Sequence, residues 1–195
     1  MKKIITISRE FGAGGGTIGK LVAKRLGYDY YDRDIILDAA RESSMPVENF
    51  LRLDETVTTN FGFAQSLFDM LNKPMSEKIF EDQKNIIRKV GEKGSCVIVG
   101  RNANWILGEY DHCLHVYAHG KTQWRVRRMM EFLPELSEEQ VLEKLKVVDK
   151  MRTKYCTHFT NTDFGSAKGY DLAINTSTIG IERAVDIICE LAKDD

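Results

Sequence analysis

The chain has 195 residues, of which 43% are hydrophobic and 29% are charged. This composition excludes intrinsic disorder and fits one compact domain with a small insert. Lysine and arginine number 28 against 29 acidic residues, which excludes bulk electrostatic attraction to nucleic acid or to an acidic membrane. Any anion-binding site must therefore be a local feature of the sequence.

Two further features concern the compartment. The chain contains no apolar run long enough to cross a bilayer, and its first ten residues lack the apolar stretch of a signal peptide. We therefore expect a cytoplasmic protein without a membrane partner. The cysteines are widely spaced with no Cys-x-x-Cys pair, and we expect them to be reduced: Cys96, Cys113, Cys156 and Cys189.

The first predicted element is a buried strand over residues 3–8, because a β-branched run ends there at a glycine-rich turn. The next element is a helix from Thr17 to Leu26, whose apolar residues recur on one helical face and which ends at Gly27. A strand, a glycine-rich loop and a helix in this order form the arrangement that binds phosphate groups.

The middle of the chain is predicted to be mostly helical. Residues 28–32 allow a second strand, whereas Arg33 to about Glu92 shows helical periodicity and is expected to contain no strand. An amphipathic stretch in this block runs from Ser76 to Val90. Three strands, each followed by a helical segment, are predicted next: Cys96–Val99, Cys113–Tyr117 and Leu172–Ile174. This alternation indicates an α/β protein with a parallel sheet.

Two helices are predicted in the last third of the chain. Ser137 and Gln140 form a capping box, which starts a helix that continues toward Tyr155. The final helix spans Gly180 to Lys193. Because we find no internal repeat and no interdomain linker, we expect a single domain.

The segment from Arg9 to Lys20 carries five glycines and allows more than one phosphate-binding alignment. The literal P-loop pattern GxxxxGK runs from Gly14 to Lys20, but it puts Leu21 at the magnesium-binding Ser/Thr position. A loop from Arg9 to Gly15 instead gives the strand, the loop and the helix their usual lengths. In that alignment Gly15 occupies the lysine position, so the P-loop lysine is missing.

Two other interpretations of the glycines stay open. Gly14, Gly16 and Gly19 satisfy the dinucleotide fingerprint GxGxxG, with Asp32 near the place of the ribose-binding acid. Against this interpretation, the helical block of about sixty residues that follows is longer than the crossovers of a dinucleotide fold. The glycines also suit a tight turn that binds no ligand.

Arginines supply the second class of candidate site residues. Arg101 follows the predicted strand Cys96–Val99 and so lies at the carboxyl edge of the sheet, where an arginine can clamp a phosphate. Between Lys121 and Lys154 two basic clusters flank an acidic stretch, which fits a hinged lid that closes over a polyphosphate and excludes water. Solvated surface charge is the alternative explanation of both features.

Taken together, the motifs resemble the cytidylate kinase-like branch of the P-loop nucleoside monophosphate kinases, nearly from end to end. The resemblance is carried by ITISREFGAGGGTIGK, GYDYYDRDII, CVIVGRNANWIL, HVYAHGKTQWRVRRMM, DKMR and YDLAINTSTIGIERAV. It implies one α/β domain, residues 1–195, with the P-loop NTPase three-layer fold, a parallel sheet, a helical NMP-binding insert and a helical lid. The implied core covers about residues 1–32, 93–120 and 168–195, the insert 33–92 and the lid 121–160.

The same resemblance implies residues for three roles. ATP phosphates are expected on Arg9, Gly12, Ala13, Gly14, Gly15, Gly16, Thr17 and Lys20, and Mg²⁺ on Thr17. The acceptor is expected on Asp32, Arg101, Asp149 and Arg152. The catalytic arginines around the transferring group are expected to be Arg125, Arg127, Arg128 and Arg152.

The chain departs from the family pattern in the donor and the acceptor sites. Gly15 replaces the lysine, for which Arg9, Lys20 or a lid arginine are the candidate substitutes. Leu37 and Asp38 stand where a Tyr-Arg pair is expected at the CMP site. Asn102 replaces the acid of the Gly-Arg-Asp motif, and Leu145 replaces a further lid arginine.

Two functions from different classes follow from the resemblance. The leading one is a cytidylate kinase-like phosphotransferase that uses ATP and Mg²⁺ to phosphorylate a (d)CMP-like acceptor. The second is a catalytically inactive nucleotide-binding or regulatory module of the same fold. Both imply nucleotide ligands and no nucleic-acid partner, and both are compatible with a monomer or a homo-oligomer. An NAD-binding protein is a distant third.

Overall fold

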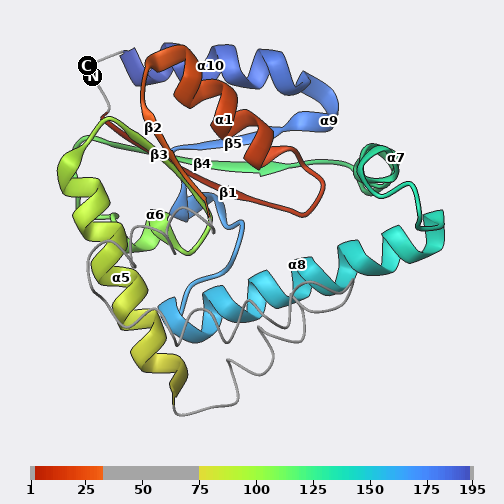
Figure 1. Ribbon diagram of the computed structural model, residues 1–195, viewed down its shortest axis with the longest axis horizontal. Helices are drawn as coiled ribbons and strands as arrows, with labels where there is room; N and C mark the ends of the chain where they lie inside the picture. Colours follow the sequence, from red (N-terminus) through yellow and green to blue (C-terminus); the bar gives the residue numbers. More distant parts are fainter. Residues whose placement is uncertain (1–2, 33–74, 194–195) are drawn as a thin grey trace.

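The structure is a computed structural model that describes residues 3–32 and 75–193. Its sheet consists of the strands β1 (Ile4–Arg9), β2 (Asp29–Tyr31), β3 (Cys96–Val99), β4 (Cys113–His119) and β5 (Leu172–Asn175). All neighbours pair in parallel, in the order β2-β3-β1-β4-β5 (Figure 1). The central strand β1 therefore ends between β3 and β4, and the loop that follows it lies at the middle of the carboxyl edge.

Helices cover both faces of this sheet (Figure 1). In chain order the helical elements are α1 (Gly15–Leu26), α5 (Met75–Lys93), α6 (Ala103–Ile106), α7 (Thr122–Phe132), α8 (Glu138–Thr160), the 3₁₀ turn η2 (Ala167–Gly169), α9 (Thr176–Ile179) and α10 (Ile181–Lys193). One face carries α1 and α10, and the other carries α5, α6 and the second half of α8. None of the described helices combines the length and the hydropathy needed to cross a membrane.

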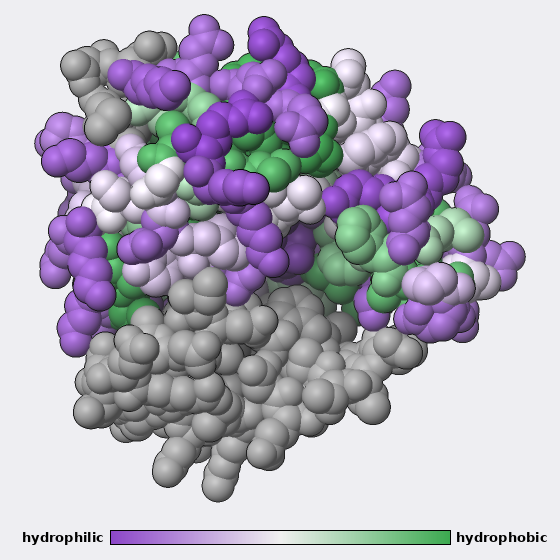
Figure 2. Space-filling view, turned by 45° about the horizontal axis from the view of Figure 1, so that its top comes forward, coloured by the Kyte–Doolittle hydropathy of each residue, from purple (hydrophilic) through white to green (hydrophobic). Residues whose placement is uncertain are grey.

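The two faces have separate cores because β1 alternates its side chains. Ile5 and Ile7 are fully buried against α1 and α10, whereas Ile4 packs with α5, α6 and α8 on the other side. Each such side chain contributes roughly 1.5–3 kcal/mol when it is buried. On the face shown in Figure 2, hydrophilic residues lie between the exposed apolar patches.

Most predicted elements are confirmed within the described residues. All of the predicted strands form, including β2 inside the segment 28–32, and α5 contains the amphipathic stretch 76–90. The first helix begins at Gly15, two residues before the predicted Thr17, because Gly14 adopts a left-handed conformation and already acts as its N-cap. The rest of the predicted insert, residues 33–74, lies outside the described residues.

The sequence did not predict the short elements η2 and α9, each of three or four residues. Such short helices carry no periodic signal. The strand order also contradicts the dinucleotide-binding interpretation, because β3 rather than β2 lies beside β1, whereas that fold has the order 3-2-1-4-5-6.

Candidate active site

The loop between β1 and α1 consists of residues 10–14. Its conformation depends on two glycines with positive φ, Gly12 at 79° and Gly14 at 84°. A Cβ atom at Gly14 would also collide with Cδ1 of Ile181 on α10. The alignment that runs from Arg9 to Gly15 therefore agrees with the structure. The alignment that ends at Lys20 is wrong, because Lys20 lies in the second turn of α1.

The first turn of α1 presents backbone donors to this loop. The helix has twelve residues, and the N–H of Ile18 makes its first bond, to the carbonyl oxygen of Gly14 at 2.9 Å. The N–H groups of Gly15, Gly16 and Thr17 precede it and have no partner within the helix. Because the first turn holds no acidic side chain, these donors and the helix dipole form a site suited to an anion.

Arg128 of α7 lies across the entrance of this loop. Its Nη2 atom donates to Thr17 Oγ1 at 2.9 Å, and its Cζ atom would lie 3.7 Å from a Cβ atom at Gly14. Burial lowers the pKa of Arg128, and the nearby Glu131 opposes this shift. Arg127, by contrast, is exposed and donates to a carbonyl oxygen of its own helix. Of the two neighbouring arginines, only Arg128 reaches the loop.

Arg125 joins the helices α7 and α8 to the loop and is 7% exposed. Its Nη1 atom donates to the Phe11 carbonyl oxygen at 3.0 Å and to Asp149 Oδ2 at 2.5 Å, and its Nε atom lies 3.4 Å from a Glu10 carboxylate oxygen. The other oxygen of Asp149 accepts a bond from the Phe11 N–H at 2.7 Å. In this structure Arg125 and Asp149 therefore hold the loop backbone in place.

A cluster of three arginines lies where β1 and β3 end. Arg152 of α8 donates to the carbonyl oxygen of Arg9 at 2.8 Å. Burial is the main reason that the pKa of Arg152 falls to about 10, although Asp149 partly opposes the fall. Burial, followed by the charges of Arg152 and Arg101, lowers the pKa of Arg9 well below its usual value. Because the positive charges of the three arginines disfavour one another, an anionic ligand would stabilise the cluster.

A strained turn presents Arg101 to this cluster. Gly100, Arg101 and Asn102 have φ values of 83°, 59° and 54°, so three successive residues are left-handed. Gln83 of α5 supports the turn, because its Nε2 atom donates to the Arg101 carbonyl oxygen at 3.1 Å and to the Tyr155 hydroxyl at 2.9 Å. Strain held in place by buried hydrogen bonds is typical of functional sites.

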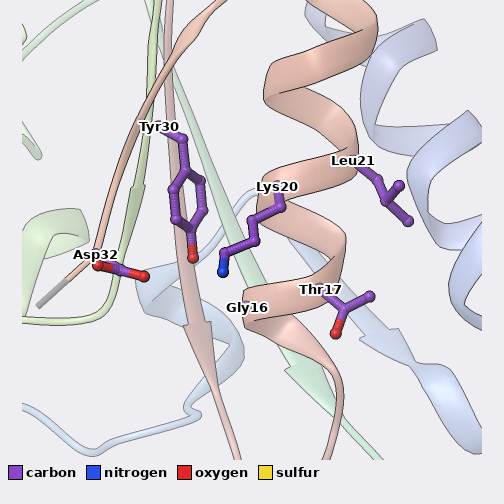
Figure 3. A pocket seen from close by; sticks show the side chains of 6 residues that line it. All are labelled: Gly16, Thr17, Lys20, Leu21, Tyr30 and Asp32. Carbon is purple, nitrogen blue, oxygen red and sulfur yellow. The ribbon is translucent and has the colours of Figure 1, made fainter. Parts of the chain in front are cut away.

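A pocket of about 480 Å³ opens beside the loop, between α1 and β2 (Figure 3). It is lined by Gly16, Thr17, Lys20, Leu21, Tyr30 and Asp32. The Lys20 side chain points toward Tyr30 and Asp32, with its ammonium 5.6 Å from the centre of the Tyr30 ring (Figure 3). Leu21 points to the opposite side of α1. The pocket thus offers a cation, a carboxylate and a phenol next to the phosphate-binding loop.

The structure brings most of the predicted site residues together. Those that lie on or reach the loop are Arg9, Gly12, Ala13, Gly14, Gly15, Gly16, Thr17, Arg125, Arg128, Asp149 and Arg152. Lys20 and Asp32 line the neighbouring pocket, and Arg101 lies at the same sheet edge. Only Arg127 points elsewhere.

Four further residues of the site were not predicted from the sequence. Thr176 Oγ1 donates to the Ala13 carbonyl oxygen at 2.9 Å, and Glu10 pairs with Arg125 of α7. Tyr30 lines the pocket, and Gln83 supports the strained turn. Side chains alternate along a strand, so Tyr30 lies on the same face of β2 as Asp32. The sequence pattern could therefore have predicted the position of Tyr30. Thr176 and Gln83 act through contacts that no local pattern indicates.

Comparison with known proteins gives a consistent family assignment. The model of the family described as "Cytidylate kinase-like family" matches residues 4–178. A cytidylate kinase from Saccharolobus islandicus is 25% identical over 189 residues, which cover 95% of this chain and 88% of that protein. A uronate isomerase from Corynebacterium glutamicum is 29% identical over 110 residues, or 56% of this chain, but this stretch is only 21% of the isomerase.

Solved structures agree with the fold. A protein from Eubacterium ventriosum, described as uncharacterized, is 25% identical with a TM-score of 0.76, and the match covers 98% of this chain and 99% of that one. The shikimate kinase of Bacteroides thetaiotaomicron is 17% identical with a TM-score of 0.55, over 98% of both chains. The second likeness shows a shared fold.

Proposed function

The chain belongs to the cytidylate kinase-like family, and we propose that it transfers the γ-phosphate of ATP to a (d)CMP-like acceptor. The observation that carries this proposal is the phosphate-binding loop at the start of α1, which is surrounded by Arg9, Arg128 and Arg152. Phosphoryl transfer needs positioned reactants and positive charge around the transferring group rather than covalent help from the protein. A loop of backbone donors within a ring of arginines meets both needs.

The donor would bind with its phosphates on the loop. The N–H groups of Gly15, Gly16 and Thr17 are suited to the phosphate oxygens, and the left-handed glycines let the backbone approach them closely. Arg128 lies over the same loop, so it would exchange its bond to Thr17 for a phosphate contact.

The residues present fit a magnesium ion that arrives with the nucleotide. Mg²⁺ prefers oxygen ligands and is usually held by one or two side chains together with phosphates and water. Thr17 exposes a hydroxyl at the loop, and Asp32 lines the same pocket. Among the described residues no three His, Cys, Asp or Glu side chains form a metal cluster, so phosphate oxygens would complete the ligand set. The ion would neutralise charge on the phosphates.

The acceptor would bind at the carboxyl ends of β1 and β3. Arg101 and Arg152 would hold its phosphate, because guanidinium groups bind phosphate oxygens in pairs. A monophosphate oxygen is already ionised near neutral pH, so the reaction needs no general base. Leu37 and Asp38, which stand where the CMP site is expected, belong to residues 33–74, outside the described part of the chain.

A nucleotide-binding module without catalysis is the second candidate. The observation that favours it is Gly15 at the position of the P-loop lysine, because loss of a transition-state contact costs on the order of several kcal/mol. Both candidates predict that ATP binds to the loop, so binding alone does not separate them.

Turnover separates the two candidates. We would measure ADP formation from Mg·ATP with a panel of nucleoside monophosphates that includes CMP and dCMP, beside a calorimetric ATP titration of the same sample. The proposal predicts turnover that depends on CMP or dCMP, and in Arg101→Ala a KM for that acceptor raised about tenfold or more with ATP binding retained. ATP binding without turnover on any acceptor would favour the module.

A further inference from the structure

The position of the missing lysine is filled by another side chain. A Cβ atom at Gly15 would lie 2.6 Å from Cβ and 2.9 Å from Cγ of Arg9, distances that real Cβ atoms do not tolerate. Arg9 is the last residue of β1, and its side chain therefore crosses over the start of α1. No lysine fits at position 15 while Arg9 keeps this conformation, so the two features are linked.

The guanidinium group of Arg9 then passes over Gly100. A Cβ atom at Gly100 would collide with Nη1 of Arg9 and would lie 2.9 Å from its Cζ. Gly100 also has a φ of 83°, which a side chain disfavours. Arg9 thus lies in a groove formed by two glycines, one at the start of α1 and one at the end of β3. The Arg9 side chain therefore extends from the loop, and its guanidinium group lies at the edge of the sheet.

The Arg9 side chain lies between the loop and the edge of the sheet, and the surroundings of its guanidinium favour a bound anion. Arg101 and Arg152 lie close enough to disfavour its charge, while Asp32 and Tyr30 favour it more weakly. One end of its side chain touches the loop proposed for ATP phosphates, and the other lies at the sheet edge proposed for the acceptor. A phosphate bound between these places would offset the repulsion among the three arginines.

Lys20 has none of these features. It is exposed in the second turn of α1, and its ammonium lies above the Tyr30 ring rather than over the loop. Reaching the loop would require it to leave the pocket that it lines. The geometry therefore separates the two candidate substitutes for the lysine.

We propose that Arg9 takes the role of the absent P-loop lysine and contacts the β and γ phosphates of ATP from the end of β1. This inference rests on the proposed function, because it assumes that ATP phosphates occupy the loop. A guanidinium is planar and always charged, and it can hold two phosphate oxygens at once, so it needs no proton transfer to act. Gly15 and Gly100 are then the residues that make room for it.

Single substitutions test the charge. By calorimetry with Mg·ATP we expect Arg9→Ala and Arg9→Gln to weaken binding about tenfold or more, since each loses a charged phosphate contact. Arg25→Ala is the control and should stay within about threefold of the parent, because Arg25 is exposed and pairs with Asp186 at the far end of α1. Lys20→Ala should weaken binding less than Arg9→Gln, because the Lys20 ammonium lies over the Tyr30 ring rather than over the loop. Equal binding by Arg9→Gln and the parent, or a larger loss in Lys20→Ala, would overturn the inference.

A double substitution tests the geometry. Gly15→Lys alone should weaken binding, because the new side chain meets Arg9. The double variant Arg9→Gly with Gly15→Lys should bind Mg·ATP more tightly than either single variant, since the charge returns from the usual position. Thermal unfolding of each variant confirms that it is folded. A parent that does not bind ATP would refute the proposed function and this inference together, whereas a double variant no better than Arg9→Gly would refute the inference alone.

Discussion

The glycine-rich loop of residues 10–14 and the helices α7 and α8 carry the proposed site in different ways. The turns of the loop depend on its own residues, because Gly12 and Gly14 adopt the left-handed conformations that they need. The helices α7 and α8 contribute through partners far away in sequence: Arg125 and Asp149 contact Phe11 across 114 and 138 positions. A local motif therefore marks the proposed phosphate site, whereas the charge around it comes from long-range contacts.

Gly14→Val should have the largest effect on stability and on ATP binding, because it changes the backbone conformation of the loop itself. A β-branched residue there would add left-handed strain and a collision with Ile181, about 2–5 kcal/mol of lost stability in total. It should also abolish ATP binding. Urea unfolding and ATP calorimetry measure the two effects. Gly27→Ala is the control, because Gly27 has a φ of 69° with open space around it and should lose only about 1–2 kcal/mol. If the Gly14→Val variant folds and its ATP affinity is unchanged, the loop is not the ATP-binding site.

Asp149→Ala removes contacts that join the loop to the helices α7 and α8. It would leave the buried Arg125 without one of its two carboxylate partners and the Phe11 N–H without its acceptor, a loss of about 2–3 kcal/mol in the free energy of unfolding. If Asp149 positions the loop, the variant should also raise KM for ATP more than KM for the acceptor. Asp186→Ala breaks the exposed pair with Arg25 and should cost less than about 1 kcal/mol. Equal losses of unfolding free energy in Asp149→Ala and Asp186→Ala would contradict the role of Asp149 in holding the loop.

Thr176→Val tests whether the loop depends on a support outside both regions. The Thr176 hydroxyl is fully buried and lies 2.9 Å from the carbonyl oxygens of Ala13 and of His119, to either of which it can donate, so its removal should cost about 1–2 kcal/mol. Thr178→Val on the exposed side of α9 should change the unfolding free energy by less than about 0.5 kcal/mol. Chemical denaturation compares the two, and no difference between them would refute the support.

Ser137→Ala should have the smallest effect, because it alters only the start of α8. The Ser137 hydroxyl accepts a bond from the Gln140 N–H, and the Gln140 side chain returns one to the Ser137 N–H. Losing the box should lower stability by about 1 kcal/mol and leave ATP affinity unchanged. Ser166→Ala is the matched control, because Ser166 caps η2 without a side-chain bond. A change in ATP affinity would mean that the start of α8 is coupled to the loop.

The sequence predicted the elements whose signals are local. The strand-loop-helix succession, the capping box at Ser137 and the parallel sheet are all confirmed, because β-branched runs, glycine and capping residues act over a few positions. The start of α1 was placed two residues late, since glycines at the start of a helix carry little helix propensity and are recruited by packing.

The sequence predicted only part of the candidate site. Alignment with the family placed Arg125, Arg128 and Arg152 near the phosphates, and the structure brings all three to the loop. It gave no sign that Arg125 is tied down by Asp149, because their contact depends on how α7 packs on α8. It also left Arg9, Lys20 and an arginine of the predicted lid as candidates for the missing cation. The positions of the Arg9 side chain against Gly15 and of the Lys20 ammonium over the Tyr30 ring separate the first two.

The most direct test of the central claim is a crystal structure of the protein with Mg²⁺, a non-hydrolysable ATP analogue and CMP. We predict that the β-phosphate lies on the N–H groups of Gly15, Gly16 and Thr17, with the Arg9 guanidinium in contact with the β and γ phosphates. The CMP phosphate should face Arg101 and Arg152 across the γ-phosphate. An analogue bound away from the loop, or phosphates on the loop with Arg9 turned away from them, would contradict the account.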